Sequence, residues 1–97
     1  MLRLIFEWDE TKARQNLGKH RVGFDEVKTV FNDPFMVTFP DEHHSEDEQR
    51  LISVGASNNN RILLVVHTEI ETDDAAIIKI ISARKATANE RKVYEET

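Results

Sequence analysis

The sequence of 97 residues contains no cysteine. Disulfide bonds, thiolate metal ligands and cysteine nucleophiles are therefore all excluded for this chain. It also has no run of about 18 apolar residues, the length that a membrane-spanning helix requires. No apolar segment follows a basic start, as it would in a signal peptide. We therefore expect no contact with a membrane and a cytoplasmic location.

Basic residues are fewer than acidic ones, 13 against 18, and the formal net charge is -5. Proteins that coat nucleic acid through their overall charge are usually basic, so this composition argues against such a role. The two signs are nevertheless segregated along the chain. Acids gather in residues 41–48 and 69–74, whereas cations gather in residues 12–21 and at Arg84 and Lys85. The sequence is therefore compatible with a local basic surface.

The length predicts one domain, residues 1–97, with a modest core and a shallow active surface rather than a deep cleft. Asp9 is the expected N-cap of the first helix, and Thr87 and Glu90 match the capping box of the last one. The predicted strands cover residues 3–8, 35–39, 50–56, 61–68 and 76–83, and the predicted helices cover residues 10–19, 24–31 and a stretch beginning near residue 88. Residues 69–74 form a polar connection. Two early helices, an antiparallel meander and a closing helix define an α+β domain.

Four segments, FEWDETKARQNLGKH, FDEVKTVFNDP, DEHHSEDEQR and IISARKATANERKVYE, occur in the order and spacing of one known family. Over residues 6–95 the chain resembles the BrnT family, the ribonuclease toxins of type II toxin-antitoxin systems. The resemblance implies a small RelE-like fold, an antiparallel sheet with two N-terminal helices and a C-terminal helix. It also implies a BrnA-type antitoxin that neutralises the toxin in a hetero-oligomer and supplies the contact with operator DNA.

Cleavage of RNA without a metal requires a base near the 2'-hydroxyl, cations for the charge on the phosphorane and a proton donor for the leaving oxygen. The catalytic candidates are Arg61, His67, Arg84 and Lys85. Each has a simpler interpretation. Arg61 flanks a hairpin turn, His67 lies among valines as packed histidines do, and the two cations at the end of the last strand are solvated or paired with Glu90. The choice between these interpretations stays open at this point.

The alternation of side chains along strands predicts which candidates share a face of the sheet. Arg61 and His67 are expected on one face of their strand, and Ser82 and Arg84 on the same side as Ile80. A β-bulge would reverse either assignment near the strand ends. We expect the antitoxin to cover a face that presents both Arg61 and Arg84.

Four further cations are candidates for RNA contacts: Lys12, Lys19, Arg50 and Lys79. A solvated surface, or contact with acidic antitoxin side chains, is the alternative for the two lysines of the first helix. His43 and His44 stand beside acidic residues, but a loop without a defined scaffold does not hold converging metal ligands. We therefore expect no metal and no cofactor.

Two positions depart from the pattern of the family. Ile70 stands where many members carry an arginine, and Lys79 stands where arginine is common. Two functions from different classes therefore remain. The first is an active endoribonuclease, favoured because Arg61, Arg84 and Lys85 are present. The alternative is a weak or inactive toxin homologue that mainly binds its antitoxin and acts as a transcriptional co-repressor.

Overall fold

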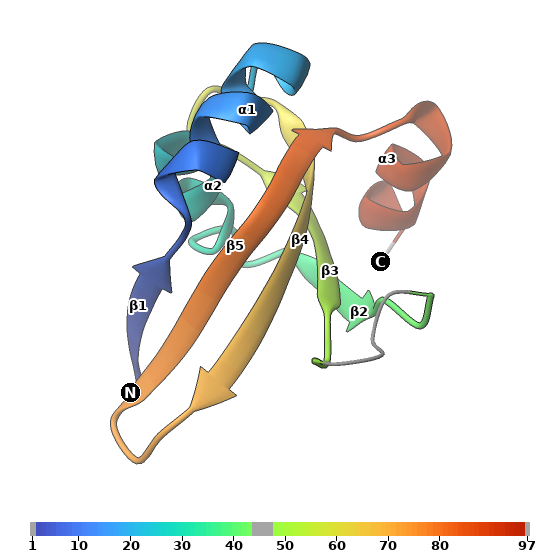
Figure 1. Cartoon of the computed structure of the whole chain (residues 1–97). Helices are drawn as coiled ribbons and strands as arrows, with labels where there is room; N and C mark the ends of the chain where they lie inside the picture. Colours follow the sequence, from blue (N-terminus) through green and yellow to red (C-terminus); the bar gives the residue numbers. More distant parts are fainter. Residues whose placement is uncertain (1, 44–47, 97) are drawn as a thin grey trace.

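A five-stranded sheet organises the chain in the computed structural model, which describes residues 2–43 and 48–96. The strand order is β1-β5-β4-β3-β2, and three helices pack around the sheet (Figure 1). The strands are β1 Arg3–Glu7, β2 Val37–Pro40, β3 Leu51–Ala56, β4 Ile62–Glu71 and β5 Ala75–Lys85, and the helices are α1 Glu10–His20, α2 Phe24–Val30 and α3 Ala88–Glu95. The α+β class is therefore confirmed. Among the described residues, no helix is both long and apolar enough to span a bilayer.

The sheet is mixed, which corrects the expectation of a wholly antiparallel one. Strands β2, β3, β4 and β5 are antiparallel neighbours, but β1 pairs with β5 in parallel. Parallel neighbours need a connection long enough to return the chain to the same end of the sheet. Residues 8–74 supply that connection, because both early helices and the first three strands of the meander lie between β1 and β5.

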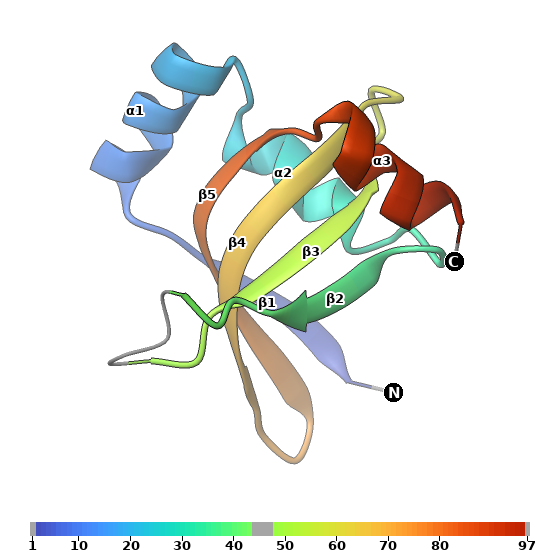
Figure 2. The ribbon, with the colours of Figure 1, turned by 90° about the vertical axis from the view of Figure 1, so that its right-hand side faces the viewer.

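Two helices lie on opposite sides of the sheet, α2 behind it and α3 in front of it (Figure 2). The core forms on the α2 side, where Phe24, Val27 and Val30 pack against Leu63 and Ile78. No side chain of α3 is buried. Its predicted capping box is present, and the helix is attached to the rest of the chain by Glu90, which binds Arg84 of β5, and by Tyr94, whose hydroxyl donates to Asp33 at 2.6 Å. One face of the sheet is thus filled by a core and the other is only partly covered.

A β-bulge in β5 decides which way its last side chains point. His67 pairs with Ile80 and Val66 pairs with Ser82, so Ile81 has no partner on β4. Ile80 is buried in the core, whereas Ser82 lines the opposite face of the sheet. The expectation that Ile80, Ser82 and Arg84 share a side is therefore wrong, because the extra residue reverses the alternation.

The two longest strands extend further than their sequence patterns predicted. β4 continues to Glu71 and β5 begins at Ala75, so the polar connection predicted for residues 69–74 shrinks to residues 72–74. Ile70 belongs to β4, pairs with Ile77 and is 62% exposed. Backbone pairing with a neighbouring strand holds this polar stretch extended, although its side chains gain little from burial.

Candidate functional site

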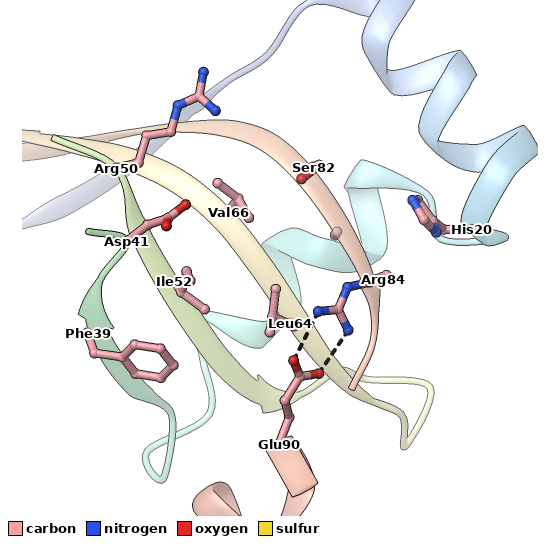
Figure 3. Close-up of a pocket in the computed structure, with 11 residues that line it drawn as sticks. His20, Phe39, Asp41, Arg50, Ile52, Leu64, Val66, Ser82, Arg84 and Glu90 are labelled. Carbon is pink, nitrogen blue, oxygen red and sulfur yellow. Dashed lines mark hydrogen bonds and ion pairs between the residues drawn. The ribbon is translucent and has the colours of Figure 1, made fainter. Parts of the chain in front are cut away.

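The partly covered face of the sheet carries an open groove of about 630 Å³ (Figure 3). One row of cross-strand neighbours runs across it from β2 to β5: Phe39, Ile52, Val66 and Ser82. Leu64 completes an apolar floor. Along each strand, the residues next to this row point into the core, so the row itself faces the groove. The bulge at Ile81 brings Ser82 onto the same face.

Polar side chains from three different elements form the rim of this groove. His20 comes from the end of α1, Arg84 from β5 and Glu90 from α3, while Arg50 directly precedes β3. Asp41 also lines the groove and is buried. An apolar floor with a few charged groups at its rim is typical of ligand-binding sites.

Glu90 holds the guanidinium of Arg84 through two parallel hydrogen bonds. Nη1 of Arg84 donates to Oε1 of Glu90 at 2.8 Å, and Nη2 donates to Oε2 at 2.9 Å. This hydrogen bonding lowers the pKa of the Glu90 carboxyl, and it raises the pKa of Arg84 further above its ordinary value. A guanidinium has five N–H donors, so others remain for a phosphate while Glu90 fixes its orientation. The ion-pair interpretation of Arg84 is thus confirmed, and it leaves room for a ligand.

A second depression of about 330 Å³ adjoins the groove and shares His20, Arg50 and Ser82 with it. Lys12 and Lys19 line this depression from α1. Three of the four cations predicted to contact RNA are therefore gathered along one continuous surface. The fourth, Lys79, lies farther along β5 between its cross-strand neighbours Glu7 and Thr68, and it lines neither depression.

Arg61 lies on the α2 side of the sheet, away from the groove. Its Nε donates to Oε2 of Glu26 at 2.9 Å, its Nη2 forms a second bond to the same carboxylate, and Nη2 also donates to the carbonyl of Arg21 at 3.1 Å. The pair lowers the pKa of the Glu26 carboxyl. The predicted common face for Arg61 and Arg84 is therefore wrong. Arg61 also lines a separate depression of about 240 Å³, together with Lys85 and Arg91.

His67 is 1% exposed and its ring points into the core side of the sheet. Its Nε2 lies 2.7 Å from Oγ of Ser53, and that hydroxyl lies 2.7 Å from Oγ1 of Thr38. The ring meets Phe31 edge-on, with 5.1 Å between centroids. Burial lowers the pKa of His67 below its ordinary value of 6.5. Among the described residues, the histidine that lines the groove is His20, not His67.

The burial of His67 predicts how stability depends on pH. In the unfolded chain this imidazole takes up a proton near pH 6.5, but in the folded protein it does so only at lower pH. The free energy of unfolding should therefore fall as pH drops below 6.5, by up to about 1.4 kcal/mol per pH unit from this group. The variant His67→Gln should show a flatter profile between pH 7 and 5 in urea denaturation. Equal slopes for the two proteins would contradict this assignment.

Asn16 is a structural anchor of the site that the sequence did not reveal. Its amide nitrogen donates to the carbonyls of Val22 and Ala83, at 2.9 and 3.0 Å, and its oxygen accepts from the Ala83 nitrogen at 3.0 Å. β1 pairs with β5 only as far as Lys79. Beyond that point, Asn16 supplies the hydrogen bonds that a neighbouring strand would give to the backbone of Ala83. Asn16 thereby fixes the backbone between Ser82 and Arg84. Nothing in the sequence distinguishes it from the other polar residues of α1.

The expectation of no metal site concerns residues 41–48. Within residues 2–43 and 48–96, no three or more His, Asp or Glu side chains are grouped so that they could hold a metal ion. His44 lies outside the residues that the structure describes. The absence of a metal therefore stays a prediction.

Comparison with known proteins identifies the family. Residues 8–90 match the model of the family described as "Ribonuclease toxin, BrnT, of type II toxin-antitoxin system". The chain thus belongs to the ribonuclease toxins of type II toxin-antitoxin systems, in the BrnT family. Its structure is similar to the crystal structure of the ribonuclease toxin BrnT of Brucella abortus, with a TM-score of 0.63 and 25% identity over 88% of this chain and 97% of that one. No match was found among curated proteins.

Proposed function

We propose that this chain is a metal-independent endoribonuclease that inhibits growth by cutting RNA in the groove. The observation that supports this most is the guanidinium of Arg84, held by Glu90 at the rim of an apolar floor and joined there by His20 and Arg50. A cation that is already oriented stabilises developing negative charge without reorganising. The chain would act in the cytoplasm, where its RNA substrate lies.

In the proposed reaction, the 2'-oxygen of a ribose attacks the adjacent phosphorus and the 5'-oxygen of the next nucleotide leaves. The proton of the 2'-hydroxyl passes to a base, and the leaving oxygen takes up a proton. Arg84 donates hydrogen bonds to the non-bridging oxygens, whose charge increases in the transition state. His20 is the proton-transfer group of the groove, because imidazole is the commonest one in catalysis and His67 is buried on the other side of the sheet.

The other candidates take different parts in this proposal. Glu90 is a positioning residue for Arg84, and Arg61 holds the hairpin between β3 and β4 against α2. Lys12, Lys19 and Arg50 extend the cationic surface along which the RNA strand continues. Lys85 lines the separate depression that also contains Arg61, so we assign it no contact with RNA in the groove.

A type II toxin implies a cognate antitoxin, and we propose that a BrnA-type antitoxin neutralises this chain by covering the Arg84 groove. β2 is an edge strand beside the groove, and an edge strand offers unpaired backbone groups to an extended partner. In the resulting hetero-oligomer, only the antitoxin contacts operator DNA.

One observation favours the second candidate function, a weak or inactive homologue that works as antitoxin-binding protein and co-repressor. Glu90 neutralises Arg84, which reduces its attraction for a phosphate. The departures at Ile70 and Lys79 weigh less, since neither residue lines the groove.

Controlled expression tests the two functions against each other. We expect expression of the chain alone to arrest growth and co-expression of the neighbouring antitoxin gene to restore it. The purified chain should cleave RNA equally well with and without EDTA, because no step of the proposed reaction uses a metal. Normal growth together with intact RNA would favour the antitoxin-binding homologue instead.

A further inference from the structure

We propose that the groove accepts unpaired RNA and that one base stacks on the ring of Phe39. This inference rests on the proposed function, because it names the form of RNA that the same groove would take. It concerns a side chain that the reaction itself does not need.

Phe39 occupies the end of the groove opposite Arg84. It starts the row of cross-strand neighbours on the edge strand β2, directly beside Ile52, and it is 40% exposed. Figure 3 shows its ring on one side of Ile52 and Leu64, with the guanidinium of Arg84 on the other side. An exposed aromatic ring, an apolar floor and an oriented cation thus lie in succession across the sheet.

This succession matches the parts of a single-stranded nucleotide. A base presents apolar faces that stack on aromatic rings whatever its identity, and the phosphate beside it requires cations. The floor of Ile52, Leu64 and Val66 has no charged group, so it suits bases rather than phosphates. The cations stand only at the rim.

Duplex RNA does not fit the same surface. Its bases are paired and stacked inside the helix, and it presents chiefly phosphates and 2'-hydroxyls to a protein. An apolar floor would gain nothing from them. The net charge of -5 further weakens binding that depends on phosphates alone.

Phe35 provides a matched control on the same segment. It lies between α2 and β2, is 70% exposed and does not line the groove. Its backbone nitrogen donates to Asp33 at 2.9 Å, a bond that a change of side chain leaves in place. Phe39→Ala and Phe35→Ala therefore both remove an exposed phenyl ring, and only Phe39 lines the groove.

The experiment compares cleavage of one RNA oligonucleotide, single-stranded or annealed to its complement, by the full-length wild type, Phe39→Ala, Phe39→Trp and Phe35→Ala. We expect the wild type to cut the single strand and spare the duplex. Phe39→Ala should lower kcat/KM by about 5-fold to 150-fold, mainly through KM, as the loss of one stacked base predicts. Phe39→Trp should restore cleavage, and Phe35→Ala should match the wild type.

Thermal melting of each variant tests whether the loss is structural. If Phe39→Ala does not fold, Phe39→Leu replaces it, because leucine keeps the apolar cover of Ile52 and lacks the aromatic face; the same loss is expected. Wild-type rates for the Phe39 variants, or equal cutting of single strand and duplex, would overturn the inference.

If the wild type cuts neither form, the proposed cleavage fails, and the inference is judged by fluorescence titration with the same single-stranded RNA. Binding that Phe39→Ala weakens and Phe35→Ala does not would still support it. Failure to bind, or binding that Phe39→Ala leaves unchanged, would overturn it.

Discussion

Replacing Arg84 with alanine is expected to lower the rate of RNA cleavage by about a hundred- to a thousand-fold. The reason is that its guanidinium is fixed before substrate arrives, through two hydrogen bonds to Glu90, at the rim of the groove. Such a preoriented donor stabilises the phosphorane directly. Arg84→Lys should recover only part of the rate, because an ammonium keeps the charge but loses the two-pronged geometry. Single-turnover cleavage by purified variants measures the effect.

The matched control for this result is Lys92→Ala. Lys92 is an exposed cation on α3, close in sequence to Glu90, and it lines neither the groove nor the adjoining depression. Its loss changes the net charge by the same amount as the loss of Arg84. We expect Lys92→Ala to cleave at the wild-type rate. Equal effects of the two substitutions would show that Arg84 acts only through overall charge.

Replacing Asn16 with alanine should lower the free energy of unfolding by about 2 to 4 kcal/mol. The substitution leaves three buried backbone groups without their hydrogen-bond partner. These groups are the nitrogen and the carbonyl of Ala83 and the carbonyl of Val22. Each buried polar group left unsatisfied costs about 1 to 3 kcal/mol, and water entering the gap recovers part of the loss. Urea denaturation measures this change. Asn16→Asp should be at least as destabilising as alanine, because it buries a carboxylate oxygen against the carbonyls of Val22 and Ala83, which need a donor.

Gln15→Ala is the control for that prediction. Gln15 precedes Asn16 on α1 and also ends in an amide, but its side chain is exposed. Its replacement should change stability by less than about 0.5 kcal/mol, as is usual for surface positions. A similarly small change for Asn16→Ala would mean that the contact between α1 and β5 contributes little to the fold.

Local signals in the sequence were sufficient to predict the helix boundaries. Asp9 accepts a hydrogen bond from the nitrogen of Lys12 at 3.0 Å, and Thr87 and Glu90 form the reciprocal bonds of a capping box. Caps depend on residues only three positions apart, so their physical cause is contained in a short stretch of chain. The five strands were predicted for the same reason, from runs of apolar and β-branched residues.

The arrangement of the site depended on contacts between distant segments. The bulge at Ile81 arises from the pairing of β4 with β5, and neither apolar run carries a sign of it. That one residue turns Arg84 away from the core and separates it from Arg61. The exposure of Phe39 is equally invisible in the sequence, because an aromatic residue in a strand is usually read as part of the core. The candidate cations were named from the sequence, and alternation placed Arg61 correctly with His67 but placed Arg84 on the wrong side, beyond the bulge.

Titration of the isotope-labelled chain with single-stranded RNA, followed by amide chemical shifts, shows where on the sheet the RNA binds. Methoxy groups in place of the 2'-hydroxyls would block the attack and keep the RNA intact. The largest changes are expected along the row that crosses the sheet, at Phe39, Ile52, Val66 and Ser82, and at Arg84 beside it. Changes confined to the α2 side, around Glu26 and Arg61, would contradict the assignment of the groove as the site of RNA cleavage.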